Sequence, residues 1–292
     1  MQDYPLSIRG TAGITGSLPV TGGIPLAEGE APAGTTFMLQ GESGPKPTQT
    51  TVLGTWPDGS ARWLLIDAVA PAGEYLLTPG GSSLPLGAIR VVETEIENGE
   101  VNLRTDGADL VLAEDASIRF EAVDAHGVTY TATPETVEIE REGPVRSTLS
   151  WSGEFLDGGG ERLFSFRLRA SVYAYSSRVL LQPLILVDPD SGVLCNLREL
   201  RLRITLPGTT GAIIGGDPNW TGDTAIPTRL FQRDDEQYDL DGASGGKAPG
   251  WAEIQSSMCS VSLAMRDFWQ QWPKSLEVDV DDLVLGLLPT FN

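Results

Sequence analysis

The feature that most constrains the fold of this chain is the alternation of apolar and polar residues in short runs. Residues 163–169 read LFSFRLR and residues 200–206 read LRLRITL, and such period-two patterns place alternate side chains on opposite faces of a strand. The runs are separated by many of the 34 glycines and 20 prolines. Only residues 266–272 could form a helical turn. The sequence therefore predicts an all-β protein with almost no helix.

The spacing of the runs predicts two domains. Residues 1–87 hold short runs joined by Gly/Pro-rich connections, which is typical of a small barrel, and residues 88–292 hold longer strands, which indicate an antiparallel β-sandwich. The nearly continuous apolar run at residues 179–187 predicts a strand buried on both faces. Residues 208–250 are rich in Gly, Asp and Thr and predict long loops around one or two short strands, which we expect to be a contact surface.

The charge balance excludes some partners. Forty acidic and 20 basic residues give a formal net charge of −20, so we expect no nucleic-acid partner, because the surface repels phosphates.

No apolar stretch is long enough for a membrane span, and residues 1–5, MQDYP, do not resemble a signal peptide. The two cysteines, Cys195 and Cys259, lie in apolar runs and are expected to be buried free thiols.

Residues suited to catalysis or metal binding are few. The only histidine, His126, lies in a DAHG hairpin turn, where a solvated loop residue is the ordinary reading. No cofactor is expected. The one metal that the sequence could accommodate is Ca²⁺, which takes several oxygen ligands. Its candidate ligands are Asp234, Asp235, Asp239 and Asp241, although solvated acidic loops are the ordinary reading of these residues.

Three aromatic residues in or beside the predicted loops form a candidate binding set. Trp220, Tyr238 and Trp251 are flanked by Gly, Asp and Pro residues. Loop aromatics stack on sugar rings and anchor protein partners, but they also close the ends of a sandwich. The sequence leaves open glycan contact, protein contact and plain packing.

Three segments together resemble one family. They are residues 22–29 with 56–67 (GGIPLAEG and WPDGSARWLLID), residues 142–146 (EGPVR), and residues 265–274 (MRDFWQQWPK) running on to 285–289. The combination resembles the N-terminal RIFT-related barrel and central β-sandwich of YetA-like and exo-rhamnogalacturonan-lyase-like proteins. In those lyases an α/α-toroid domain follows and supplies much of the active site, and no catalytic residue is carried over to this sequence.

Two-domain relatives without the toroid also resemble RIFT-related structural proteins of tailed phages. The resemblance thus implies a non-catalytic structural component of a virion, made in the host cytoplasm. Its expected partners are other proteins of the assembly and copies of itself. Contact with host glycans is a further option under this reading. Two alternatives stay open: a polysaccharide lyase or its fragment, and a stand-alone carbohydrate-binding protein, either of them in the cytoplasm.

Overall fold

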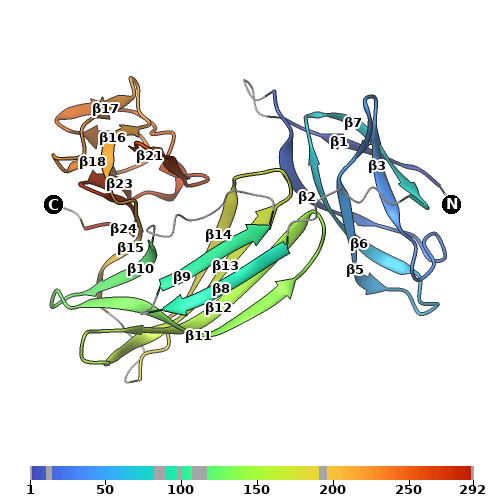
Figure 1. Cartoon of the computed structure of the whole chain (residues 1–292), viewed down its shortest axis with the longest axis horizontal. Helices are drawn as coiled ribbons and strands as arrows, with labels where there is room; N and C mark the ends of the chain where they lie inside the picture. The colour runs from blue at the N-terminus through green and yellow to red at the C-terminus, as the bar shows by residue number, and fades with distance from the viewer. Residues whose placement is uncertain are drawn as a thin grey trace.

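In the computed structural model the chain folds almost entirely into antiparallel β-strands (Figure 1). The structure describes residues 2–10, 15–81, 90–97, 100–106, 117–190 and 196–290. Within these ranges the one helical element is a single 3-10 turn, η1 (Trp269–Gln271), inside the stretch where the sequence allowed one. The all-β prediction is confirmed. No helix in the described ranges is long and apolar enough to cross a membrane.

The N-terminal part of the chain forms two small sheets around a core of its own. The sheet orders are β1-β7-β3-β4 and β2-β6-β5. The strands are β1 (Tyr4–Ile8), β2 (Leu18–Pro25), β3 (Phe37–Gly41), β4 (Gly44–Lys46), β5 (Thr48–Thr55), β6 (Ala61–Ala70) and β7 (Gly73–Pro79). Leu39 and Leu77 of the first sheet meet Leu64 and Ala68 of the second in one buried cluster. The short strands thereby close into a barrel-like unit.

The turn between β5 and β6 is fixed by hydrogen bonds among its own residues. Gly59 donates its N–H to the carbonyl of Trp56 at 2.9 Å and has a φ of 84°, a left-handed value that favours glycine. The Asp58 carboxylate accepts the hydroxyl of Ser60 at 2.6 Å and its N–H at 2.9 Å, and these bonds lower the pKa of Asp58. The WPDGS stretch is therefore a local scaffold element of the barrel.

The remainder of the described chain forms a sandwich of a long sheet and a short one. The long sheet has eleven strands in the order β14-β13-β12-β11-β10-β15-β24-β23-β18-β19-β20, and the short sheet has the order β17-β16-β21-β22. In chain order, the strands of this part begin with β10 (Ser117–Asp124), β11 (Thr129–Arg141), β12 (Arg146–Leu156), β13 (Arg162–Tyr173), β14 (Val179–Leu186) and β15 (Leu197–Thr205). They continue with β16 (Thr209–Ile214), β17 (Trp220–Gly222), β18 (Thr228–Gln232), β19 (Tyr238–Leu240), β20 (Ala243–Gly245), β21 (Trp251–Ser256), β22 (Ser260–Ala264), β23 (Lys274–Asp279) and β24 (Asp282–Leu288).

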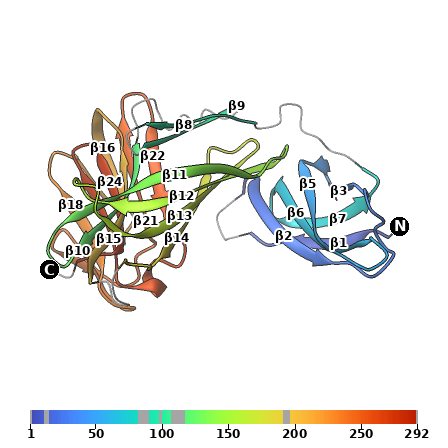
Figure 2. The ribbon, with the colours of Figure 1, turned by 90° about the horizontal axis from the view of Figure 1, so that it is seen from below.

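The sandwich core follows from the alternation seen in the sequence. Phe164 and Phe166 of β13 point inward and are 1% exposed, and Phe155 of β12 packs edge-on against both. On the opposite face Arg167 is exposed. A separate hairpin of β8 (Arg90–Glu97) and β9 (Glu100–Asp106) is drawn apart from the barrel in Figure 2.

The prediction of long loops at residues 208–250 is wrong. Five strands, β16 to β20, lie in this region, and Ile214, Leu230, Tyr238 and Leu240 are buried in the sandwich core. The strands are only three to six residues long, so few apolar residues suffice to bury the inward face of each. The buried amide of Gln232 also ties the connections together, because it donates to the carbonyls of Asp234 and Gly246. The region therefore supplies part of the sandwich core, while the turns between its strands are exposed.

The cysteine expectation also needs correction. Cys259 is free, as expected, but it is exposed in the turn between β21 and β22, where its carbonyl accepts the N–H of Ser256 at 2.8 Å. A turn residue lies outside the sandwich layers, so its neighbours in sequence do not bury it. Cys195 lies outside the described residues.

The barrel and the sandwich meet at the tip of the β11–β12 hairpin. In Figure 2 these long strands run from the sandwich to the barrel. Asp67 of β6 is fully buried, and its two carboxylate oxygens lie 3.1 Å from Arg141 and 3.2 Å from Arg146, at the two sides of the hairpin tip. The Thr21 hydroxyl also donates to Asp67 at 2.7 Å. An ion-pair network therefore joins the two domains.

A backbone contact supports this ionic network. The side-chain oxygen of Gln49, on β5, accepts the N–H groups of Val145 and Arg146 at 3.0 Å each. A Cβ added to Gly143 would lie 2.2 Å from that oxygen, so only glycine fits beside the glutamine. Asp67 and Gln49 of the barrel thus hold one hairpin tip of the sandwich by its side chains and by its backbone. We call this set of contacts, with Arg141, Gly143, Val145 and Arg146, the domain junction.

Candidate functional site

The outer strand β14 carries an exposed apolar surface. Leu180, Leu184 and Leu186 lie on one face of the strand and are 45%, 48% and 44% exposed, and Val187 just beyond the strand is 63% exposed. We call these four residues the leucine edge. Among the residues that the structure describes, β14 pairs with β13 alone and forms the end of the eleven-stranded sheet. The expectation that this run would be buried on both faces is wrong.

The reason for the exposure is the position of β14 in the sheet. Its other face, with Val179, Leu181 and Ile185, packs in part against the sandwich core. Leu180, Leu184 and Leu186 face the opposite way, where the neighbouring strand presents Arg167 and Arg169 opposite Leu184 and Gln182. Aliphatic side chains exposed along an unpaired strand are typical of surfaces that bind other chains.

A proline interrupts the backbone of this outer strand. Pro183 lies at the middle of β14, opposite Leu168 of β13. Because proline has no N–H, it occurs in sheets at positions where the N–H would point away from the neighbouring strand. The free side of β14 therefore lacks a donor at its centre. The side chains of the leucine edge, rather than a continuous backbone ladder, are the surface available to a partner.

Opposite charges mark the two ends of β14. Arg178 precedes the strand, is exposed, and has no ion-pair partner within the described residues. Asp188 and Asp190 follow the strand and share Arg162, each at 2.8 Å from one of its terminal nitrogens. Glu154 adds a third carboxylate at 2.6 Å from Nε of the same arginine. One guanidinium thus faces three carboxylates, and this end of the strand is negative.

Hydrogen bonds keep the acidic end charged. Partial burial alone would raise the pKa of Asp188, but the N–H and hydroxyl of Ser165 and the charge of Arg162 lower that pKa below its ordinary value. Burial would likewise lower the pKa of Arg162, and its hydrogen bond to Glu154 and the charges of Asp188 and Asp190 raise it instead. Both partners are therefore ionised at neutral pH.

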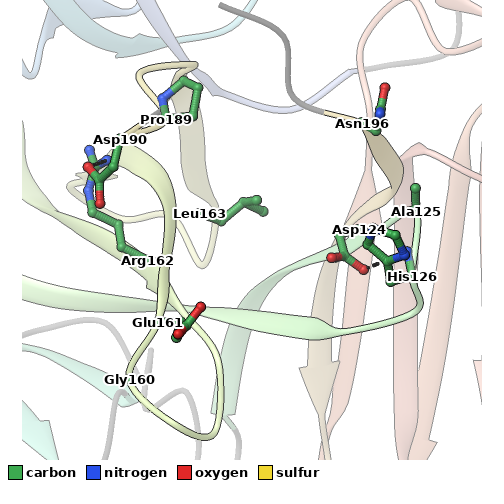
Figure 3. Close-up of a pocket in the computed structure, with 10 residues that line it drawn as sticks. All are labelled: Asp124, Ala125, His126, Gly160, Glu161, Arg162, Leu163, Pro189, Asp190 and Asn196. Atoms are coloured by element: carbon green, nitrogen blue, oxygen red, sulfur yellow. Dashed lines mark hydrogen bonds and ion pairs between the residues drawn. The ribbon is translucent and has the colours of Figure 1, made fainter. Parts of the chain in front are cut away.

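A cavity of about 760 Å³ opens beside the acidic end of β14 (Figure 3). Arg162 and Asp190 lie on one side of it, and Asp124 and His126 of the β10–β11 turn lie on the other. Asp124 accepts the backbone N–H of His126 at 2.9 Å, so the histidine sits in a hairpin turn, as the sequence predicts. Glu161 adds a further carboxylate. The lining has excess negative charge, which opposes binding of an anionic sugar.

The predicted aromatic set does not form one exposed platform. Tyr238 is 3% exposed, and its hydroxyl accepts the N–H of Asp217 at 2.8 Å, so the expectation that it is a surface aromatic is wrong. Trp220 lies on β17 and packs against the sandwich core. Trp251 lies on β21 and is close enough to Gly215 that a Cβ there would approach its indole nitrogen to 2.5 Å. Both tryptophans are partly buried, and packing accounts for much of their surface.

The predicted calcium ligands are engaged separately. Asp234 accepts the N–H groups of Glu236 and Gln237 at 2.9 and 2.8 Å and so shapes its own turn. Asp239 pairs with Arg233. Asp241 is an exposed turn residue between β19 and β20 with a φ of 47°, and Asp235 is exposed. Among the described residues no group of three or more His, Cys, Asp or Glu side chains is placed to hold a metal ion.

Sequence reasoning missed the residues of the domain junction and of the leucine edge. One signal was available for the junction: Asp67 interrupts the apolar run LLIDAVA, and a carboxylate in a buried strand requires a charged partner. For the leucine edge, Pro183 inside the apolar run indicated an outer strand.

Comparison with protein families bears on the barrel. Residues 10–76 match the PcRGLX-like N-terminal RIFT barrel domain. The matched stretch spans β2 to β6 and the beginning of β7. The N-terminal domain is a RIFT barrel. It is similar to the first domain of rhamnogalacturonan-lyase-like proteins, in agreement with the resemblance seen in the sequence. No curated protein sequence is significantly similar to the chain.

Proposed function

We propose that the chain is a non-catalytic structural module that assembles with other protein subunits through the leucine edge. The observation that carries this proposal is the outer strand β14, which exposes Leu180, Leu184, Leu186 and Val187 together on a chain with a formal net charge of −20. Covering half-exposed aliphatic side chains contributes about 1 kcal/mol each. Four such residues supply a useful part of the free energy of association.

The domain junction supports the same proposal. Asp67 and Gln49 fix the hairpin tip of the sandwich to the barrel. A structural subunit must hold its surfaces at defined positions, and a buried, hydrogen-bonded contact between domains does so. The setting that we propose is a virion, with other virion proteins as partners, and this part of the proposal rests on the resemblance to structural proteins of tailed phages.

The proposal is tested by the assembly state and interactions of the purified chain. Sedimentation velocity over a range of concentrations, and co-sedimentation with particles from the native source, should show the protein in a larger assembly. The Leu184→Asp variant should lose this association, because a carboxylate cannot be buried against apolar groups without a partner. The Val280→Asp variant is a matched control, since Val280 is 58% exposed in the β23–β24 turn. Full association of Leu184→Asp would overturn the proposal.

A polysaccharide lyase is the second candidate. It is favoured by the match of the barrel to the PcRGLX-like family and by the cavity that places His126 and Arg162 across from one another. A lyase needs a base for the proton at C5 and a group that neutralises the uronate carboxylate. Arg162 is already neutralised by three carboxylates, which weakens it for the second role.

Ultraviolet absorbance separates the two candidates. Uronate-containing polymers incubated with the protein, with and without Ca²⁺, should give no unsaturated product if the structural proposal is correct. Product formation that is lost in the His126→Gln variant and kept in Leu184→Asp would instead establish the lyase.

A further inference from the structure

We propose that the partner of the leucine edge is a second copy of this chain, related by a two-fold axis close to Pro183. This inference rests on the proposed assembly function and names the partner of that same surface. In such a pair the two β14 strands run antiparallel, face to face, with their exposed leucines between them. Two-fold pairs are the commonest arrangement of identical subunits, because one self-complementary surface serves both copies.

The outward face of β14 is partly self-complementary about its centre. With the axis at Pro183, Leu180 of one copy lies over Leu186 of the other, and Leu184 lies over Gln182. Sheets that pack face to face lie about 10 Å apart, a spacing that leucine side chains from both sides fill. The apolar stretch is therefore covered along its length.

The charges at the ends of β14 select the antiparallel direction. Arg178 at one end has no ion-pair partner in the described part of the chain, whereas the other end carries Asp188 and Asp190 in excess over Arg162. An antiparallel pair brings the unpaired arginine of each copy to the acidic end of the other. A parallel pair would place the two acidic ends together, and like charges repel.

Pro183 favours packing of faces over extension of the sheet. An added strand on the free side of β14 would find no donor at the centre of the ladder. A face-to-face pair requires no backbone donors from β14. It also covers the exposed leucines of both copies, so the pair is closed.

The interface must extend beyond β14 to be stable. Stable interfaces bury about 800 Å² per partner, more than four aliphatic side chains offer. The neighbouring strand contributes Arg167 and Arg169 to the same face, and Glu140 already pairs with Arg169 at 2.6 Å. A modest apolar centre with a charged rim predicts a dissociation constant in the micromolar range, on the order of 1–100 μM.

The test is a pair of charge reversals measured by sedimentation equilibrium at about 0.15 M salt, where the Debye length of about 8 Å screens the net charge of the chain. Arg178→Asp and Asp190→Arg should each dimerise at least tenfold more weakly than the natural chain, since each homodimer then holds two like-charge contacts. Mixed in equal amounts, the two variants should form a heterodimer, because both contacts are again between opposite charges. Arg178→Asp mixed with Arg266→Asp is the control: Arg266→Asp should dimerise like the natural chain, since Arg266 is 93% exposed and remote in sequence from β14. Its heterodimer with Arg178→Asp keeps one like-charge contact and should not be favoured over that homodimer.

Three outcomes decide the inference. Recovery of dimerisation in the mixture, together with its loss in Leu184→Asp, establishes the two-fold pair. A dimer that is insensitive to both charge reversals overturns it, and so does a chain that remains monomeric at 100 μM, about the upper end of the expected range. If the monomeric chain still enters particles and Leu184→Asp does not, the assembly function stands and only the identity of the partner is wrong.

Discussion

The carboxylate of Asp67 in the RIFT barrel lies 3.2 Å from the guanidinium of Arg146 in the sandwich, and Asp67 is completely buried. Removing one member of a buried ion pair leaves its partner without compensation. Asp67→Asn should therefore lower the free energy of unfolding by about 2–4 kcal/mol, less than for a fully buried pair because the arginines are partly exposed. Urea unfolding followed by tryptophan fluorescence measures this change.

The control for this substitution is Glu74→Gln in the same domain. Glu74 is exposed and, within the described ranges, accepts the hydroxyl of Ser7 at 2.8 Å as its one hydrogen bond, so its loss should change stability by less than about 0.5 kcal/mol. Small-angle scattering should also show a broader distribution of domain positions in Asp67→Asn. If both substitutions lowered the free energy of unfolding equally, the buried ion pairs of Asp67 would stabilise the protein no more than an exposed hydrogen bond does.

Gln49 and Gly143 should be coupled in a double-mutant cycle. Gln49→Ala leaves two N–H groups at the hairpin tip without their acceptor and should cost about 2 kcal/mol. Gly143→Ala should cost a similar amount, because its Cβ would displace the Gln49 side chain. The double variant should cost clearly less than the two single costs added, since the alanine at 49 leaves room for the new methyl group. Strict additivity in thermal unfolding would contradict the contact.

Tyr238 should behave as a core residue. Tyr238→Phe removes the acceptor of the Asp217 N–H and should cost about 1 kcal/mol, whereas Tyr238→Ala should cost about 3–5 kcal/mol by opening a cavity. A surface aromatic that serves only to bind a glycan would give near-zero values in both cases. Calorimetry of the two variants distinguishes these roles.

Acid should weaken the contacts of Asp188. The pKa of Asp188 is lower in the folded chain than in the unfolded chain, so its stabilising effect is present above the unfolded value of about 4. That effect is lost as the pH falls through the lower folded value. Asp188→Asn should thus be less stable than the natural chain at pH 7, by about 0.5 kcal/mol because the group is half exposed and screened.

The difference between Asp188→Asn and the natural chain should disappear in strong acid. Thermal midpoints measured from neutral pH down to about pH 2 follow this convergence, since the natural carboxylate takes up its proton as the pH falls. Asp235→Asn, at an exposed position, should match the natural chain throughout. A gap that stays constant with pH would show that the carboxylate acts through something other than its charge.

The sequence was sufficient for what depends on local patterns. Alternation at residues 163–169 predicted a strand with alternate side chains on opposite faces, and in the structure Phe164 and Phe166 lie in the core while Arg167 is exposed. Strand order is not a local property. The apolar run around Leu184 looked like a strand buried on both faces, and only the position of β14 at the end of the sheet exposes it.

The site was less predictable for the same reason. Tyr238 and Asp239 are neighbours in a polar stretch, yet one is a core residue and the other pairs with Arg233 on the surface. Their roles depend on which face of β19 meets the sandwich. The buried position of Asp67 was foreseeable from its apolar neighbours, but its partners lie 74 and 79 residues away in sequence and could not be named without the structure.

Pro183 has a consequence for solubility during synthesis and folding. A chain that exposes an outer strand as apolar as β14 is at risk of stacking strand upon strand into insoluble fibrils, which grow by unbroken backbone pairing. A residue that cannot donate a hydrogen bond stops such growth at its own position. Proline at the middle of β14 thus lets the chain keep an exposed apolar surface without the continuous backbone pairing on which fibrils elongate.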